Sequence, residues 1–335
     1  MRKVLVALLV LVVGALALPP LWFELSPREA PPLAAAESFA TLPSGVRMHY
    51  VERGNGPAVV LVHGLPGQAS DWRDTVALLA AHGRRVIAVD RIAYGHSDAR
   101  PNDEFTLDAN ARELRELLDV LDLSDVTVVG WSYGGGTALV AAHQGSPRIA
   151  RIVLVGSMGP GSDAGMPPRP VLALSRLVFR WVHAVPPAGI AVQRAMSEQA
   201  FSAQALPADW LPSLSANMVQ AKTFAAFSAE GAAIGTELPD SAGLELPILV
   251  IHGDDDRLVP VAVGRALAKN NSRAELLEIP GGSHMLPITH AKLLADRIAS
   301  FSAPPAPAEP ATPPGAELGS PSELPEHWMD VLAAR

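Results

Sequence analysis

Residues 128–139 read VVGWSYGGGTAL and hold Ser132 inside a Gly-x-Ser-x-Gly pattern. A valine-rich strand is expected before the serine and a helix after it. A direct turn from strand to helix forces the central residue into a strained conformation and leaves room only for small residues two positions away on either side. That strain lifts the side chain above the sheet. We therefore expect Ser132 to react, and Gly135 and Gly136 to let the helix pack closely against the sheet.

On both sides of this stretch, short β-branched runs alternate with amphipathic helical runs. Strands are expected at residues 46–52, 58–63, 84–90, 126–130, 149–156, 246–253 and 274–279, and helices at 72–82, 106–123, 133–144, 261–270 and 288–301. This alternation predicts an α/β fold with a mostly parallel sheet and helices on both faces. Between residues 157 and 245 the alternation stops and prolines interrupt helical sequence, so we expect an inserted helical lid there.

The two ends of the chain differ from this domain. Two basic residues precede an unbroken apolar run at the N-terminus, so a signal peptide or a membrane anchor is expected at residues 1–23. We expect a linker at residues 24–38, the α/β domain at 39–302 and a Pro/Ala-rich tail at 303–335. The protein is therefore expected to be exported, to the periplasm or beyond, or to be anchored through membrane contact of residues 4–23.

Composition excludes several classes of function. A net charge of −8 with no basic stretch argues against binding to nucleic acid. The absence of cysteine from all 335 residues rules out disulfides, thiolate catalysis and cysteine-ligated zinc. The histidines show no metal-ligand spacing, so a zinc site is not expected. The expected partner is a small molecule, and no feature of the sequence indicates an oligomeric state.

A reactive serine needs hydrogen-bond donors for the negative oxygen that forms when it attacks a carbonyl group. Residues 59–67, VVLVHGLPG, end a strand in a glycine-rich turn that can aim the N–H of Leu65 at the same point as the N–H of Tyr133. The N–H of Tyr133 lies at the expected helix N-terminus, where negative charge is favoured. We expect these two groups to form an oxyanion hole, and His63 to stabilise the loop.

The serine also needs a base and an acid that orients the base. Residues 248–260 end a strand in three consecutive aspartates, of which Asp256 lies closest to the next helix and is preferred. After the last strand, His284 lies on a glycine-rich loop that can reach over the sheet edge, whereas His290 belongs to the following helix. We expect His284 to be the base.

With serine, acid and histidine in this order, the sequence resembles the α/β-hydrolase superfamily from about Phe39 to Phe301. The motifs HGLPG, GWSYGG, HGDDDRLVP and GGSHMLP together carry the resemblance. The segment DRIAYGHSD, with Asp90 and Ser97 in structural roles, is similar to a loop of the branch that contains haloalkane dehalogenases, epoxide hydrolases, carbon–carbon bond hydrolases, cofactor-free haloperoxidases and small esterases. Dehalogenases and epoxide hydrolases of this branch have aspartate as nucleophile, so Ser132 disfavours both chemistries.

The resemblance implies a serine hydrolase that cleaves a carboxylic ester or a related acyl compound. Ser132 would attack the carbonyl carbon, His284 would take its proton, and Asp256 would orient the histidine. The N–H groups of Leu65 and Tyr133 would hold the oxyanion. Water activated by the histidine would then release the acyl group, and neither a cofactor nor a metal would be needed.

Two alternatives stay open at this point. The same triad can cleave a carbon–carbon bond in a β-diketone-like substrate, or the chain can be a ligand-binding relative with little turnover. Apolar side chains in the expected lid either pack the lid against the core or line a pocket that favours an apolar acyl or alcohol group. Trp72, just beyond the expected oxyanion loop at residues 63–67, and Trp181 in the lid are candidate walls of the substrate pocket.

Overall fold

The computed structural model describes residues 37–100, 104–162, 186–234 and 239–303. The predicted signal peptide or anchor, most of the predicted linker, Trp181 and residues 304–335 of the predicted tail lie outside these ranges. In the part that the structure describes, no helix combines the length and the apolar character needed to cross a bilayer.

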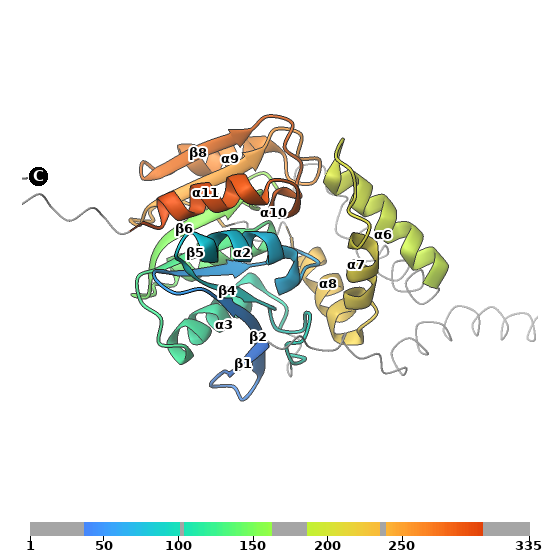
Figure 1. Ribbon diagram of the computed structural model, residues 1–335, viewed down its shortest axis with the longest axis horizontal. Coiled ribbons are helices and arrows are strands. Elements are labelled where there is room, and N and C mark those ends of the chain that lie inside the picture. Colours follow the sequence, from blue (N-terminus) through green and yellow to red (C-terminus); the bar gives the residue numbers. More distant parts are fainter. Residues whose placement is uncertain (1–36, 101–103, 163–185, 235–238, 304–335) are drawn as a thin grey trace, which may run out of the picture. The chain divides into compact units, whose positions relative to one another are not determined.

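The core is one sheet in the strand order β1-β2-β4-β3-β5-β6-β7-β8 (Figure 1). The strands are β1 (Glu37–Thr41), β2 (Arg47–Arg53), β3 (Ala58–Val62), β4 (Arg85–Val89), β5 (Val126–Trp131), β6 (Ile149–Val155), β7 (Ile248–Gly253) and β8 (Ala274–Ile279). The pairs β1–β2 and β2–β4 are antiparallel, and the strands from β4 to β8 pair in parallel. The predicted mostly parallel sheet is confirmed. Sequence patterning did not predict the short edge strand β1.

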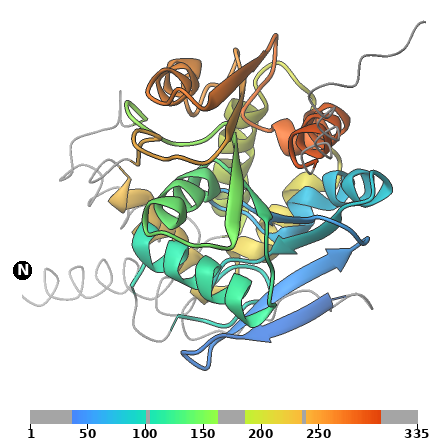
Figure 2. The same ribbon diagram turned by 90° about the vertical axis from the view of Figure 1, so that its left-hand side faces the viewer.

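Helices cover both faces of this sheet, as predicted. The helices of the core are η1 (Ala69–Trp72), α2 (Arg73–Ala81), α3 (Leu107–Val120), α4 (Tyr133–His143), α9 (Val261–Lys269), α10 (Leu286–Thr289) and α11 (Ala291–Phe301). Successive residues of a strand point to opposite faces, so Val60 packs in the cluster that includes α3, α4 and α9, whereas Leu61 packs in the cluster with α2 and α11. Figure 2 shows these two helix layers with the strands between them.

The predicted lid region contains three helices in its described part. They are α6 (Pro186–Phe201), α7 (Trp210–Met218) and α8 (Ala221–Ala233), and they stand together beside the core (Figure 1). They lie in the sequence between β6 and β7, which pair directly with each other in the sheet. The chain therefore leaves the sheet and returns to it at neighbouring strands.

Candidate active site

Ser132 occupies the turn between β5 and α4. Its backbone has φ 55° and ψ −117°, a left-handed conformation that costs energy for any residue other than glycine. A Cβ atom added at Gly130 would lie 2.2 Å from the carbonyl oxygen of Gly134, and one added at Gly134 would lie 2.3 Å from that of Val62. The turn therefore requires glycine at both positions, because any side chain there would collide with the backbone, as the sequence predicted.

The two following glycines allow a second close approach. A Cβ at Gly135 would meet the Ser157 side chain, and one at Gly136 would lie 2.8 Å from Cγ of Met158. Both contacted side chains come from the segment just after β6. The glycine run thus lets the first turn of α4 pack against the end of the neighbouring strand.

His284 and Asp256 form a buried pair on the loops after β8 and β7. Nδ1 of His284 lies 2.7 Å from Oδ2 of Asp256, and the other carboxylate oxygen accepts the backbone N–H groups of Leu258 and Val259 at 2.9 and 2.8 Å. Burial raises the pKa of Asp256, but His284, the side chain of His252 and the backbone N–H of Val259 together outweigh burial and hold that pKa well below its usual value. The acid is thus ionised and pointed at the imidazole.

The other candidates for acid and base have different partners. Asp254 accepts the backbone N–H of Gly281 at 2.6 Å, and Asp255 pairs with the exposed Arg257 at 3.2 Å. Nδ1 of His290 lies 2.9 Å from the hydroxyl of the preceding threonine. Of the three consecutive aspartates, the structure brings Asp256 to His284.

Ser132 and His284 line the same cavity. The indole N–H of Trp131, the residue before the serine, donates to the backbone carbonyl of His284 at 2.9 Å and ties the two segments together. The structure shows no hydrogen bond between the Ser132 hydroxyl and the imidazole. Such bonds are often long or poorly aligned before substrate binds and tighten in the complex. Both side chains face one cavity.

The expected oxyanion donors belong to the residue after Ser132 and to the loop after β3. Tyr133 is the first residue of α4, so its N–H has no partner within the helix. The N–H of Leu65 donates to no acceptor among the residues that the structure describes. Gly64 brings the loop close, since a Cβ added there would lie 3.0 Å from Cβ of Ser132. Both N–H groups are thus available to a ligand beside the serine.

His63 lies inside this loop. Its Nε2 accepts the backbone N–H of Arg91 at 3.0 Å, so its Nδ1 carries the proton and donates to the carbonyl of Gly64 at 2.8 Å. Burial lowers the pKa of His63 to about 3, which keeps the ring neutral. These contacts match the loop-stabilising role expected from the sequence.

A cavity of about 120 Å³ opens beside Ser132. Its apolar lining combines the core loops with the lid helices: Leu65, Pro66, Trp131, Met196, Ala200, Trp210, Leu214, Met218, Phe227, Leu258 and Met285. Three lid residues, Gln193, Ser197 and Gln199, add polar groups. In the described residues, no lysine or arginine lines this cavity.

The expectation that Trp72 forms a pocket wall is wrong. Its side chain is fully buried in the core behind Trp131, with the two ring centroids 6.3 Å apart and the rings edge to face. Core packing against α2 and the sheet buries the ring of Trp72 and keeps it from the cavity. Trp210, at the start of α7, lines the cavity instead. Sequence reasoning missed it because lid docking, and not a local pattern, brings it there.

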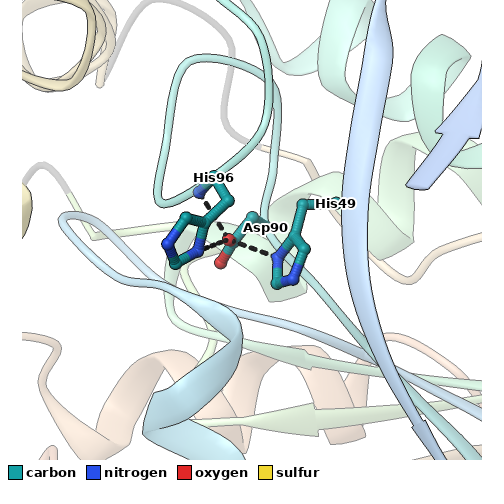
Figure 3. Close-up of side chains that lie close together, drawn as sticks. All are labelled: His49, Asp90 and His96. Atoms are coloured by element: carbon teal, nitrogen blue, oxygen red, sulfur yellow. Dashed lines mark hydrogen bonds and ion pairs between the residues drawn. The ribbon is translucent and has the colours of Figure 1, made fainter. Parts of the chain in front are cut away.

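The buried carboxylate of Asp90 holds several segments together. Its Oδ2 lies 2.7 Å from Nδ1 of His49 and accepts the backbone N–H of His96 at 2.8 Å, while Oδ1 accepts that of Ala69 at 2.6 Å. Figure 3 shows the two imidazoles on either side of the carboxylate. In the same network, the hydroxyl of Ser97 donates to the Asp90 carbonyl at 2.6 Å.

The side chains of His49, Asp90 and His96 could also ligate a metal ion, since their ligand atoms lie within 4.8 Å of one another. Both carboxylate oxygens already accept hydrogen bonds, however, and a metal would have to displace the bond to His49. The donor set therefore fits a hydrogen-bonded structural role for Asp90 better than a metal centre. The spacing of these residues in the sequence does not indicate the cluster, because His49 comes from β2 and the other two residues follow β4.

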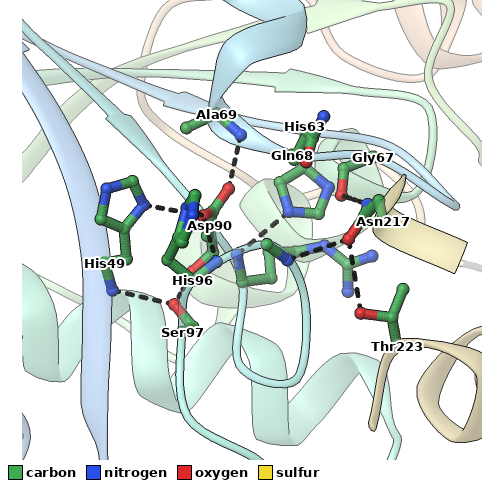
Figure 4. A network of polar contacts seen from close by, with 12 residues as sticks. His49, His63, Gly67, Gln68, Ala69, Asp90, His96, Ser97, Asn217 and Thr223 are labelled. Carbon is green, nitrogen blue, oxygen red and sulfur yellow. Dashed lines mark hydrogen bonds and ion pairs between the residues drawn. The ribbon is translucent and has the colours of Figure 1, made fainter. Parts of the chain in front are cut away.

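The lid contacts the loop after β3 through Asn217, at the end of α7 (Figure 4). Its side-chain amide donates to the carbonyl of Gly67 at 3.0 Å and accepts the backbone N–H of Gly95 at 3.1 Å. The hydroxyl of Thr223 lies 3.4 Å from the same side-chain oxygen. Asn217 thus joins the loops after β3 and β4 to the lid.

Comparison with known proteins agrees with this architecture. The family model described as alpha/beta hydrolase fold matches residues 57–291. The chain is 31% identical over 285 residues to a 2-hydroxy-6-oxononadienedioate/2-hydroxy-6-oxononatrienedioate hydrolase of Paraburkholderia xenovorans, covering 81% of this chain and 96% of that protein. It is 32% identical over 265 residues to a non-heme chloroperoxidase of Kitasatospora aureofaciens, covering 73% and 90%.

Solved structures give the same result. An esterase from Exiguobacterium antarcticum superposes with a TM-score of 0.66 at 21% identity, covering 79% of this chain and 98% of the esterase. A serine hydrolase involved in carbazole degradation superposes with a TM-score of 0.66 at 25% identity, covering 80% and 98%. The resemblance seen in the sequence is confirmed: the chain belongs to the α/β-hydrolase family and is a hydrolase of that fold.

Proposed function

We propose that this hydrolase uses Ser132 to cleave a carboxylic ester or a related acyl compound through an acyl-enzyme. The observation that carries the proposal is the strained serine at the β5–α4 turn, on the same cavity as a histidine whose other ring nitrogen is held by a buried, ionised aspartate. This arrangement supplies a nucleophile, a base and an orienting acid in one place.

The proposed reaction starts when Oγ of Ser132 attacks the substrate carbonyl carbon. His284 accepts the serine proton at Nε2, because Nδ1 is bonded to Asp256. The N–H groups of Leu65 and Tyr133 stabilise the oxyanion, each contributing roughly 3 kcal/mol in the transition state. The imidazolium then protonates the leaving alcohol, and a water molecule activated by His284 releases the acid.

The cavity favours a neutral, apolar substrate. A buried carboxylate with no cationic partner is strongly disfavoured, and none of the described lining residues is a lysine or an arginine. The relative from Paraburkholderia xenovorans is named for a substrate with two carboxylates. We therefore propose an ester with an apolar acyl or alcohol group in preference to such a dianion.

The second candidate function is cleavage of a carbon–carbon bond in a β-diketone-like substrate by the same residues. It is favoured by the 31% identity to that hydrolase across most of both chains. A panel of p-nitrophenyl esters from acetate to octanoate separates the two functions. Turnover of these esters supports the ester hydrolase, and no turnover of any of them favours carbon–carbon cleavage.

Labelling with a fluorophosphonate probe tests the catalytic serine itself. We expect wild type to be labelled and Ser132→Ala to be unlabelled. Ser44→Ala is the matched control, since this exposed serine lies in a turn away from the cavity, and it should label like wild type. An inert wild type, or a Ser132→Ala protein that labels as strongly, overturns the proposal and leaves a ligand-binding relative as the better description.

We also propose export or membrane anchoring, on the strength of the apolar run at residues 4–18 that follows two basic residues. Cell fractionation of the full-length chain, with intact-mass measurement of the product, tests this. A product that retains its N-terminal residues and stays in the cytoplasmic fraction overturns it.

A further inference from the structure

The peptide between Gly64 and Leu65 is held on its carbonyl side by two donors. The carbonyl oxygen of Gly64 accepts Nδ1–H of His63 at 2.8 Å and Nη2–H of Arg91 at 3.1 Å. A trans peptide group is planar, with its N–H pointing opposite to its carbonyl. Fixing the direction of this carbonyl therefore fixes the direction of the Leu65 N–H, which is one of the two proposed oxyanion donors.

The same guanidinium also contacts the residue that carries the other donor. Arg91 is buried, and its guanidinium carbon lies 4.7 Å from the ring centroid of Tyr133 and 4.4 Å from that of Tyr94. Cations at this distance are attracted to aromatic faces. One side chain thus bonds the carbonyl of the peptide group that carries the Leu65 N–H and also contacts the ring of Tyr133, whose N–H is the other proposed donor.

The positive charge of Arg91 is balanced from the lid. Oε1 of Glu230, on α8, lies 2.7 Å from Nη1 of Arg91, and the Glu230 side chain is fully buried. The carboxylate also accepts the hydroxyl of Tyr94 at 2.6 Å and the side-chain amide of Asn110 at 2.8 Å. Burial alone would lower the pKa of Arg91, but the charge of Glu230 outweighs burial and raises it. The guanidinium therefore stays charged between the lid and the oxyanion loop.

We propose that Arg91 is a positioning residue of the oxyanion hole and that Glu230 of the lid is the counter-charge that holds Arg91 in place. The inference rests on the proposed function, because an oxyanion forms only when Ser132 attacks an acyl group. Its consequence is that docking of α8 onto the core completes the catalytic geometry. The lid then acts on the rate of the chemical step in addition to shaping the substrate cavity.

The test removes both charges together, in the double variant Arg91→Met with Glu230→Gln. This avoids leaving one buried charge without a partner, so the variant folds more readily than either single change. We expect kcat for p-nitrophenyl butyrate to fall roughly 10- to 100-fold, less than the 10²- to 10³-fold loss that follows removal of a donor outright. KM should change by less than about threefold, since the cavity wall is untouched.

Two further readouts separate positioning from a purely structural role. A trifluoromethyl ketone forms a serine adduct that carries the oxyanion, so its inhibition constant should rise by about the same factor as kcat/KM falls. Arg91→Lys keeps the positive charge next to Glu230 and should recover part of the lost kcat. A merely structural contact would lower the thermal stability and leave both quantities unchanged in the folded fraction.

Asp209→Asn is the control for lid docking in general. Asp209 also joins the lid to the core, through Arg73 at 2.6 Å, but both side chains are more than half exposed and neither contacts the oxyanion loop. Its kcat should equal that of wild type. A double variant with wild-type kcat, or an Asp209→Asn protein with the same loss, overturns this inference alone. A wild type that turns over no ester overturns the proposed function and this inference with it.

Discussion

Asp256 and His284 are joined at 2.7 Å although they come from loops after two different strands, β7 and β8. The two strands pair in parallel, so their carboxyl ends meet at the same sheet edge. Because the carboxylate also accepts two backbone N–H groups, its direction is determined by the loop and not by the histidine alone. The loop therefore holds the carboxylate of Asp256 in one orientation relative to His284.

Asp256→Asn should lower kcat on the order of 10⁴-fold with little change in KM, because an amide no longer selects the correct tautomer of the imidazole. Steady-state kinetics on a p-nitrophenyl ester measure the loss, and circular dichroism checks the fold. The control is Asp255→Asn, since Asp255 pairs with exposed Arg257. An Asp256→Asn enzyme within tenfold of wild type would contradict the assignment of the acid.

The glycines of the serine turn should differ in their tolerance of a methyl group. At Gly134 a Cβ would lie 2.3 and 2.6 Å from two backbone carbonyl oxygens, which cannot move without shifting β3. Gly134→Ala should therefore lose activity by more than about 100-fold and lower Tm. At Gly136 the obstacle is the flexible side chain of Met158, so Gly136→Ala should be milder in both assays. Equal effects of the two substitutions would argue against the steric account.

Asp71 should make stability depend on pH. Burial raises its pKa to about 7, compared with about 3.9 in an unfolded chain. Between these two values the folded protein binds the proton more tightly than the unfolded protein, so the free energy of unfolding falls as pH rises from about 4 to 7. Asp71→Asn should flatten that slope and raise stability at pH 8 by about 1 kcal/mol or more, or roughly 2–4 °C in Tm.

Thermal unfolding of wild type and Asp71→Asn at pH 5 and pH 8 measures this effect. The exposed neighbour Asp74 provides the control, and Asp74→Asn should follow the wild-type slope. If Asp71→Asn is no more stable than wild type at pH 8, the partly buried carboxyl of Asp71 does not set the pH dependence.

Filling the cavity from the lid should shorten the preferred acyl chain. Leu214 on α7 lines the cavity, whereas Leu211 on the same helix does not. Leu214→Trp should lower kcat/KM for the octanoate ester by roughly tenfold or more, the scale of a few methylene groups in a pocket, and leave the acetate ester nearly unchanged. Leu211→Trp should retain the wild-type preference. An unchanged ratio of octanoate to acetate turnover in Leu214→Trp would place the acyl group elsewhere.

Much of the fold and the candidate site could be predicted because the physical demands there are local. The steric requirement at Gly130 and Gly134 is encoded within five residues, and it located the serine turn. The parallel sheet followed from the alternation of strands and helices, and its topology brings the loops after β7 and β8 together. Asp256, chosen among three aspartates, does lie against His284. Its catalytic role stays a prediction.

The contacts that the sequence did not predict depend on docking between distant segments. Arg91 and Glu230 are 139 positions apart, and no pattern in either segment indicates the other. His49 reaches Asp90 from a strand that pairs with β4, which spacing alone does not reveal. The prediction that Trp72 forms a pocket wall was wrong because the hydrophobicity of a side chain does not indicate whether it faces the core or the cavity.

The insertion of the lid between two hydrogen-bonded neighbours, β6 and β7, has a consequence for protein engineering. A helical segment that leaves and rejoins the sheet at adjacent positions can be exchanged for another as a cassette while the scaffold keeps its register. Such a chimera would inherit the new cassette's substrate preference. To keep its turnover, the chimera would also need a carboxylate from the new lid segment next to Arg91. Fewer lid segments are therefore suitable than the positions of the two insertion points alone suggest.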